Sequence, residues 1–244
     1  MSGGRVVVRV AGLALLIALT CAPALFKPLF LPLTGNGAPT IYTQGDLRVL
    51  TLAHLGIVLL AATASAVVAA PLGIFVTRPI GAEFLPLSRG LADIGQTFPP
   101  VAVLALTVPL VGFGETPTFI ALFLYGLLPI FENTIAGLTQ VPRTVIDAAR
   151  GMGMNGRQRL FQIELPLALP IILAGIRISA VINMGTATIG STVGAKGLGE
   201  VIIAGLLSNN IAFVLQGGMI VALLAMLLFD GMEALEDLAK RRLD

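Results

Sequence analysis

Residues 52–76 read LAHLGIVLLAATASAVVAAPLGIFV, and this stretch contains no Asp, Glu, Lys or Arg. A helix needs about 20 predominantly apolar residues to cross the hydrocarbon core of a bilayer. The stretch is long enough, and nothing in it requires water. It therefore predicts a membrane-spanning helix, and with it an all-α membrane fold.

Similar apolar blocks recur along the chain, which is 56% hydrophobic and 11% charged. Soluble domains carry about 25% charged residues, so a chain this poor in charge is not expected to have a water-exposed surface. We predict about six spans in one helical bundle. The blocks cover residues 6–26, 52–76, 91–111, 119–138, 169–189 and 211–229. We treat residues 1–244 as one transmembrane domain, with a first span and outer loop in 1–50 and a core bundle in 51–236.

The first block admits two interpretations. Arg5 and Arg9 precede an apolar run, and the small residues Ala22 and Ala24 follow it, as in a secretory signal peptide. Pro23 interrupts the small-residue site, and the apolar character continues to Phe26 and beyond. We therefore expect a retained first span rather than a cleaved signal.

The distribution of basic residues predicts the orientation, because Lys and Arg remain on the cytoplasmic side of spans. With the N-terminus inside, the opposite side holds only Lys27, Arg48 and Lys196, and Arg177 falls within the fifth block. The remaining basic residues all lie in cytoplasmic tails and connections, namely Arg5, Arg9, Arg78, Arg89, Arg143, Arg150, Arg157, Arg159, Lys240, Arg241 and Arg242. We therefore predict that both termini and the loop 140–167 are cytoplasmic.

Several functional classes are not expected. The basic residues form no continuous face, so we expect no nucleic-acid partner. With Cys21 as the one cysteine and His54 as the one histidine, neither a disulfide nor a Cys/His metal site is expected. No G-x-x-x-x-G-K-[ST] motif occurs, so ATP hydrolysis would need another protein. We expect no catalytic residue, cofactor or metal in this chain.

The loop that follows Pro142 contains most of the informative sequence. From Val145 it reads VIDAARGMGMNGRQRLFQIELP. Pro142 is a common start signal for a helix, and we expect Asp147 to lie in the first turns, where a carboxylate favours the helix dipole. We expect Ala148 and Ala149 to form a thin face open to another protein, and the glycines from Gly151 onward to end the helix.

This loop resembles one found in permeases of bacterial ATP-binding cassette (ABC) importers, written E-A-A, three residues, G, nine residues, I-x-L-P. The matching positions, at the same spacing, are Ala148, Ala149, Gly153, Ile163, Leu165 and Pro166, and Asp147 stands where Glu is usual. The resemblance implies a type I importer permease fold. It also implies that the loop is the coupling helix that docks on an ATPase subunit.

A second resemblance concerns the substrate. Residues 95–105, GQTFPPVAVLA, are similar to the third-span signature of the osmoprotectant branch, whose members import glycine betaine, carnitine and choline. Residues 148–168 and 174–199 are similar to the same branch, and the similarity covers about residues 52–218. The resemblance implies import of a small quaternary ammonium compound across the bacterial inner membrane.

The resemblance also implies partners. These are cytoplasmic ATPase subunits and a second permease, either a copy of this chain or a related subunit, within membrane lipid. Some branch members carry a fused binding domain after the last span, whereas this chain ends at Asp244. A separate periplasmic binding protein is therefore expected. Three alternatives remain: a methionine or oxyanion importer, a stand-alone secondary transporter, and an assembly factor that transports nothing.

Polar residues within the spans are the candidates for the transport pathway, because charges inside a membrane are costly. Glu132 and Arg177 lie at similar depth, and we expect them to approach each other; the alternative is that Arg177 snorkels. Other polar residues either line the pathway or bond one helix to another, namely Asp93, Gln96, Asn183, Thr186 and Thr188.

Overall fold

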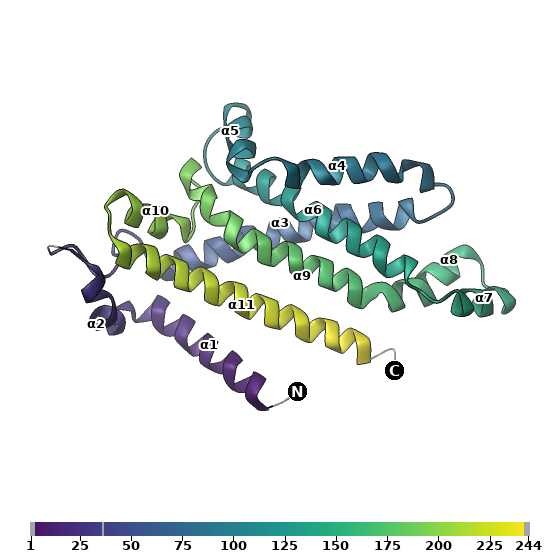
Figure 1. Ribbon diagram of the computed structural model, residues 1–244, viewed down its shortest axis with the longest axis horizontal. Coiled ribbons are helices and arrows are strands. Elements are labelled where there is room, and N and C mark those ends of the chain that lie inside the picture. The colour runs from purple at the N-terminus through teal and green to yellow at the C-terminus, as the bar shows by residue number, and fades with distance from the viewer. Residues whose placement is uncertain (1–2, 36, 242–244) are drawn as a thin grey trace. The chain divides into compact units, whose positions relative to one another are not determined.

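The computed structural model describes residues 3–35 and 37–241, and over those residues every regular element is a helix (Figure 1). Four helices are long and apolar enough to cross a membrane, and the number rises to six if each of two broken helix pairs counts as one span. The predicted all-α fold with about six spans is therefore confirmed.

The chain groups into two compact units, each with its own core. The first unit contains the residues up to Ala61, then Pro99–Leu122 and Val181–Asp230; the second contains Ala62–Phe98, Phe123–Ala180 and the residues from Gly231 onward. Four long helices contribute residues to both units, namely α3 (Leu47–Val76), α6 (Glu115–Thr139), α9 (Leu165–Gly190) and α11 (Ile211–Arg241).

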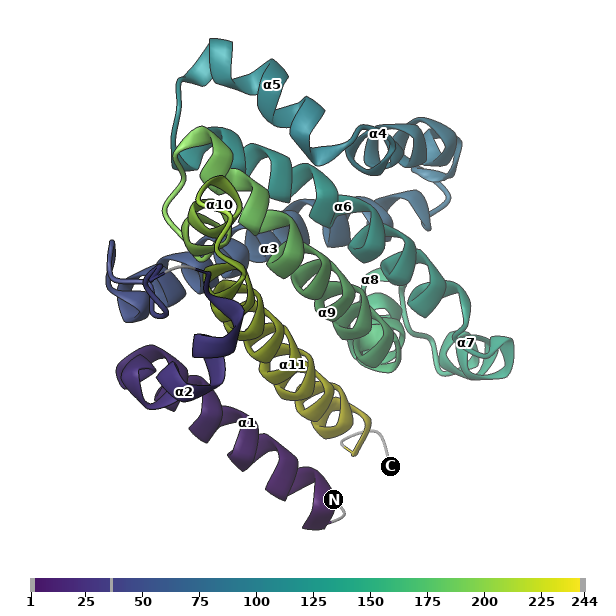
Figure 2. The ribbon, with the colours of Figure 1, turned by 60° about the vertical axis from the view of Figure 1, so that its left-hand side comes forward.

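The first unit also contains α1 (Gly3–Cys21), α2 (Lys27–Phe30), α5 (Pro100–Val111) and α10 (Gly199–Leu207). Its core is built from fully buried side chains such as Leu19, Phe30, Met184 and Ile220. In both Figure 1 and Figure 2, α1 runs alongside α11. An ion pair between Arg9 and Asp230 joins these two helices, with Nε and Oδ2 3.5 Å apart.

The first predicted span is shorter than expected. The helix ends at Cys21, and the chain bends by 101° into the short helices between Pro23 and Leu33. Pro23 accounts for the break, because proline lacks a backbone donor and its ring clashes with the preceding helical turn. The expectation of one continuous span over residues 6–26 is therefore wrong.

The third predicted span, residues 91–111, is also broken. α4 (Leu85–Thr97) ends before Phe98, and α5 begins at Pro100. Phe98 and Pro99 both have extended backbone, with ψ of 135° and 141°. A residue that precedes proline is disfavoured in the helical region, and two consecutive prolines remove two donors. A window that averages hydropathy does not detect this break.

The second unit contains the remaining short elements: a 3₁₀ turn at Ala82–Phe84, α4, α7 (Arg143–Gly151), α8 (Gly156–Arg159) and a π-helical turn at Leu160–Glu164. One cluster of its core contains the small side chains Ala69 and Ala92 beside Ile130 and Phe131, and a second contains Ala168 beside Leu138 and Ile172. Helical backbone is continuous from Gly156 to Val193. The fifth predicted span, residues 169–189, lies within this longer helix.

Candidate functional site

α7 is the short helix predicted after Pro142, and it spans Arg143–Gly151. Asp147 lies in its second turn, so the expected dipole contribution is small, since that effect is confined to the first turn. Its side chain is 67% exposed and pairs with Arg150 at 3.3 Å. Ala148 is exposed as predicted, whereas Ala149 is 1% exposed and faces its own protein. The face available to a partner is therefore formed by Asp147 and Ala148.

The end of α7 is set by Gly153, which has φ of +80°. The N–H of Gly153 donates to the Arg150 carbonyl at 2.9 Å, and the N–H of Met154 donates to the Ala149 carbonyl at 3.1 Å. These two bonds form a Schellman motif, in which a left-handed residue ends the helix. The predicted glycine turn is confirmed, and the motif position Gly153 is the residue that makes it.

The segment after α7 returns directly into a long helix. Asn155 caps α8: its Oδ1 accepts from the Gln158 N–H, and the Gln158 side chain accepts from the Asn155 N–H, both at 2.9 Å. This capping box was missed, although N-x-x-Q is its sequence signature. The following π turn closes with a bond from the Leu165 N–H to the Leu160 carbonyl. Ile163, Leu165 and Pro166 are half-buried on this arm.

One buried charge in this arm was also missed. Glu164, the unspecified position before Leu165 and Pro166, is 8% exposed and lies 2.5 Å from Nη1 of Arg78. Arg78 follows directly after α3, in the turn that leads to α4. This ion pair ties the arm that follows α7 to the α3–α4 connection. No sequence signal marks it, because the two residues are far apart in the chain.

Large apolar side chains are exposed along the same segment: Val145, Met152 and Phe161 are 36%, 72% and 64% exposed. They lie beside exposed arginines, including Arg143 and Arg157. Exposed apolar residues within a polar segment are candidates for contact with another protein. We call residues 143–163 the coupling segment.

A polar stripe runs along α4 and α6. It comprises Arg89, Asp93 and Gln96 of α4 and Tyr125 and Glu132 of α6. The Arg89 guanidinium donates to both Glu132 oxygens, at 2.6 and 3.0 Å. Gln96 Nε2 donates to the Tyr125 carbonyl at 3.3 Å. The two contacts fix α4 antiparallel to α6 within the second unit.

The end of α4 contacts α6 closely at the break before Pro99. A Cβ at Gly95 would overlap the carbonyl of Leu124, so only glycine permits this approach. The Tyr125 hydroxyl donates to the Phe98 carbonyl. Interrupted helices in membranes survive only where other groups satisfy the freed carbonyls. Residues 95–99, G-Q-T-F-P, thus contain both the helix break and residues that contact α6 beside it.

The predicted pairing of Glu132 with Arg177 is wrong. Glu132 pairs with Arg89, and Arg177 pairs with Glu236 of α11, with Nε and Oε1 2.7 Å apart. Glu236 is buried and Arg177 is half-buried, and Nη2 of Arg177 also donates to Oε2 of Glu236 at 3.2 Å. The prediction compared depth only and left out the helix faces on which the two residues lie.

The polar residues predicted near the end of α9 make helix contacts. Asn183 is fully buried, and its Nδ2 donates to the Leu122 carbonyl at 3.0 Å. Thr186 and Thr188 are half-buried and donate to the carbonyls of Ile182 and Gly185, at 3.0 and 2.7 Å. Asn183 thus bonds one helix to another, whereas the two threonines bond within their own helix.

Comparison with known proteins identifies the family of the chain. The family described as "Binding-protein-dependent transport system inner membrane component" matches residues 69–237. The osmoprotectant import permease protein OsmY of Salmonella typhimurium is 42% identical over 195 residues, which are 80% of this chain and 83% of that protein. The glycine betaine/carnitine/choline transport system permease protein OpuCB of Bacillus subtilis is 37% identical over 80% of this chain and 86% of its own.

The chain belongs to this permease family. A solved structure of the MetNI methionine ABC transporter in an inward-facing conformation matches with a TM-score of 0.70 at 21% identity, over 81% of this chain and 99% of that one. The permease therefore has the fold of type I importer permeases, and it is a multi-pass membrane protein and a transport subunit.

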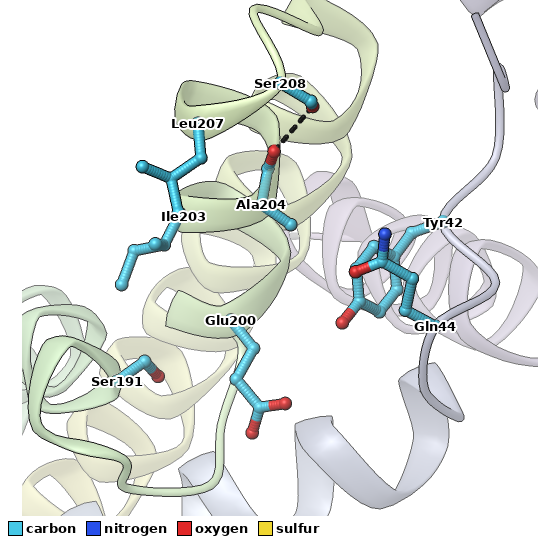
Figure 3. Close-up of a pocket in the computed structure, with 8 residues that line it drawn as sticks. All are labelled: Tyr42, Gln44, Ser191, Glu200, Ile203, Ala204, Leu207 and Ser208. Atoms are coloured by element: carbon cyan, nitrogen blue, oxygen red, sulfur yellow. Dashed lines mark hydrogen bonds between the residues drawn. The ribbon is translucent and has the colours of Figure 1, made fainter.

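The permease also has an open hollow of about 480 Å³ in its first unit. Figure 3 shows the segment with Tyr42 and Gln44 on one side of it and α10, with Glu200, Ala204 and Ser208, on the other. Tyr42 packs edge-on against Phe213, with ring centroids 5.5 Å apart. Burial, together with the negative charge of Glu200, raises the pKa of Tyr42. No local sequence pattern predicts that these two connections meet.

Proposed function

We propose that this permease forms the membrane pathway of an ATP-driven importer for an osmoprotectant, such as glycine betaine or a related quaternary ammonium compound. The observation that carries the proposal is the coupling segment, in which Asp147, Ala148 and Gly153 form an exposed, sharply ended helix at the family's motif positions. We propose that the whole chain acts as one permease domain in the bacterial inner membrane.

The proposed orientation follows from the basic residues. Arg143, Arg150, Arg157 and Arg159 all lie in the coupling segment, and such residues remain cytoplasmic. Both termini are then cytoplasmic too. Only on that side do ATPase subunits reach α7, whose exposed Ala148 allows close approach and whose neighbours Met152 and Phe161 supply apolar contact area.

The remaining partners are those that importers of this family require. Its sequence has no nucleotide-binding motif, so we propose separate ATPase subunits that move the coupling segment on ATP binding. A second permease, identical or related, completes the pathway. A separate periplasmic protein delivers the substrate. We propose that the pathway is lined by Asp93, Gln96 and Glu132, with the half-buried Thr186 and Thr188 as further candidates.

The proposed substrate class rests on two observations. The relatives are named for glycine betaine, carnitine, choline and osmoprotectants. The polar stripe holds two carboxylates and one guanidinium, and a net negative stripe disfavours an oxyanion and favours a cation. The alternatives are a methionine or oxyanion importer and, less favoured, a stand-alone secondary transporter.

Reconstitution tests the proposal. Proteoliposomes would contain the permease with its ATPase and binding protein, and uptake of radiolabelled glycine betaine, choline, methionine and molybdate would be measured. We expect uptake of the quaternary ammonium compounds that requires ATP hydrolysis and stops with a hydrolysis-deficient ATPase. Uptake driven by an ion gradient without the ATPase contradicts the importer, and uptake of methionine or molybdate alone contradicts the substrate class.

A further inference from the structure

α4 has three distinct faces. Successive residues of a helix are rotated by about 100°, so Arg89, Asp93 and Gln96 share one face. A second face packs into the second unit through Ser88, Ala92 and Gly95. The exposed apolar residues lie roughly opposite the polar face, and they are Leu87, Leu91 and Ile94. The apolar face suits lipid, and the polar face must therefore meet something else.

The polar face carries charges that lipid does not accommodate. The side chains of Arg89 and Glu132 are 46% and 38% exposed in the isolated permease. Glu132 lies seven residues before the end of α6, which corresponds to roughly 10 Å of helix. Charged residues at such depth face water or another protein. The polar stripe therefore faces water or another protein rather than lipid.

The charges of the stripe are not balanced. Arg89 forms a bidentate ion pair with Glu132. The carboxylate of Asp93, one turn along α4, has no ion-pair or hydrogen-bond partner among the residues that the structure describes. Tyr125 shares the Glu132 face of α6, since the two residues are seven apart. The stripe thus offers a carboxylate without a hydrogen-bond or ion-pair partner of its own among the described residues, one helical turn from the Arg89–Glu132 pair.

We propose that the polar stripe is a substrate contact site for small quaternary ammonium compounds, with Asp93 as the group that receives the cation. A quaternary nitrogen has no N–H to donate, so a free carboxylate and an aromatic face are the partners available to it. The inference rests on the proposed function, because it names the substrate contact within the proposed pathway.

Arg89 gives the site a second function for zwitterions. A substrate carboxylate can replace that of Glu132 on the guanidinium, because both offer the same bidentate geometry. A cation without a carboxylate, such as choline, needs Asp93 alone. A zwitterion such as glycine betaine uses Asp93 and Arg89 together. The chain has two Tyr and no Trp, so the contact remains weak, as release on the far side requires.

Thiol labelling tests whether substrate reaches the stripe. Cys21 would be replaced by Ser, and single cysteines placed at Gln96 or, as the matched control on the lipid-facing side of α4, at Leu91. The complete transporter in membrane vesicles would be treated with a trimethylammonium methanethiosulfonate reagent. We expect Q96C to react roughly tenfold faster than L91C, since water and charge reach only the polar face. Choline should slow the reaction of Q96C, and D93N, but not D93E, should remove that protection.

Equal rates at the two positions would show that the stripe lies outside the aqueous pathway and would overturn the proposal. Rapid labelling of Q96C without protection by choline would also overturn it, because water would then reach the stripe and substrate would not. Neither outcome depends on net uptake. The reconstitution experiment therefore tests the proposed importer function separately from this labelling experiment.

Transport measurements test the two charged groups. D93N should reduce the maximal uptake of choline and glycine betaine roughly tenfold, while E83Q, an exposed acid outside the stripe, leaves both unchanged. The neutral pair R89Q/E132Q avoids leaving one charge unpaired. It should reduce uptake of glycine betaine and spare choline. If D93N transports both like the wild-type protein, or if the double variant affects both equally, the assignment of these groups is wrong.

Discussion

Individual residues determine where the coupling segment ends and why it is exposed. Gly153 was expected to permit a turn, and its φ of +80° makes it the left-handed residue of a Schellman motif. Asp147 was expected to act on the helix dipole, and it pairs with Arg150 instead. The spacing of the motif was enough to locate these residues in the sequence. Their partners depend on the helical turn in which each residue lies, and the motif spacing does not predict the helix start to within one residue.

The end of α7 provides a matched pair of substitutions. Gly153→Ala forces a side chain into left-handed backbone, which costs roughly 1–2 kcal/mol. Gly151→Ala, at the last residue of the helix and with open space around it, should instead stabilise by at most about 0.5–1 kcal/mol. Thermal unfolding of the purified permease measures both, and uptake per ATP hydrolysed measures coupling. Similar effects at the two positions would contradict the Schellman assignment.

The hydroxyl of Tyr125 gives a second test at this scale. Tyr125→Phe removes the donor to the Phe98 carbonyl and leaves a polar group unsatisfied at the α4 break, with an expected cost of about 1–3 kcal/mol. Tyr42→Phe is the comparison, because the hydrogen bond between Tyr42 and Gln216 is made by the backbone N–H and survives the substitution. The difference in unfolding temperature between the two variants measures the stability that the Tyr125 hydroxyl contributes. If the two temperatures are equal, the Phe98 carbonyl has another partner.

At the scale of elements, hydropathy located the spans and missed their interruptions. The blocks at 52–76 and 119–138 correspond to single helices, α3 and α6. The breaks at Pro23 and Phe98–Pro99 fall inside apolar runs, where average hydropathy does not change. Conversely, Pro166 and Pro170 do not end the helix from Gly156 to Val193. Whether a proline ends a helix depends on what satisfies the freed carbonyls, and that is a tertiary property.

The ion pair between Arg78 and Glu164 connects the coupling segment to the α3–α4 connection. Removing one partner leaves a largely buried charge, so E164Q or R78Q should destabilise the permease by about 3–5 kcal/mol. The charge-reversed double variant R78E/E164R should recover much of that loss, and it should recover uptake per ATP. R150Q, which breaks the exposed pair on α7, should change stability by less than about 1 kcal/mol. If the stability losses of E164Q and R78Q simply add and R78E/E164R recovers nothing, the two residues do not act as a functional pair.

At the scale of the whole molecule, the sidedness remains a prediction that labelling can test. In the Cys21→Ser background, a cysteine at Met152, which is 72% exposed, should react with an impermeant thiol reagent only in inside-out vesicles. A cysteine at Leu207, 84% exposed beside the hollow, should react only in right-side-out vesicles. The charge distribution requires this result, and the reverse pattern would place the coupling segment out of reach of ATP.

The sequence predicted the family because the motif is local: its residues lie within one loop at fixed spacing. It predicted the polar residues of the stripe only in part. Asp93, Gln96 and Glu132 stood out as polar residues in apolar blocks, but Arg89 was assigned to a cytoplasmic connection, since α4 begins several residues earlier than the hydropathy block. Pairings between helices, such as Arg89 with Glu132, follow from helix faces and depth together.

The π turn at Leu160–Glu164 bears on the fixed count of nine residues between Gly153 and Ile163. A π turn contains one residue more than an α turn. Deleting one residue of Leu160–Glu164 would convert it to an ordinary turn and leave the direction of α7 about the axis of α9 nearly unchanged, because either kind of turn completes one full rotation. Deleting one residue from the ordinary α-helix that follows would instead rotate α7 by about 100°. The π turn therefore makes this arm tolerant of losing one residue at Leu160–Glu164 and at no other place along α9.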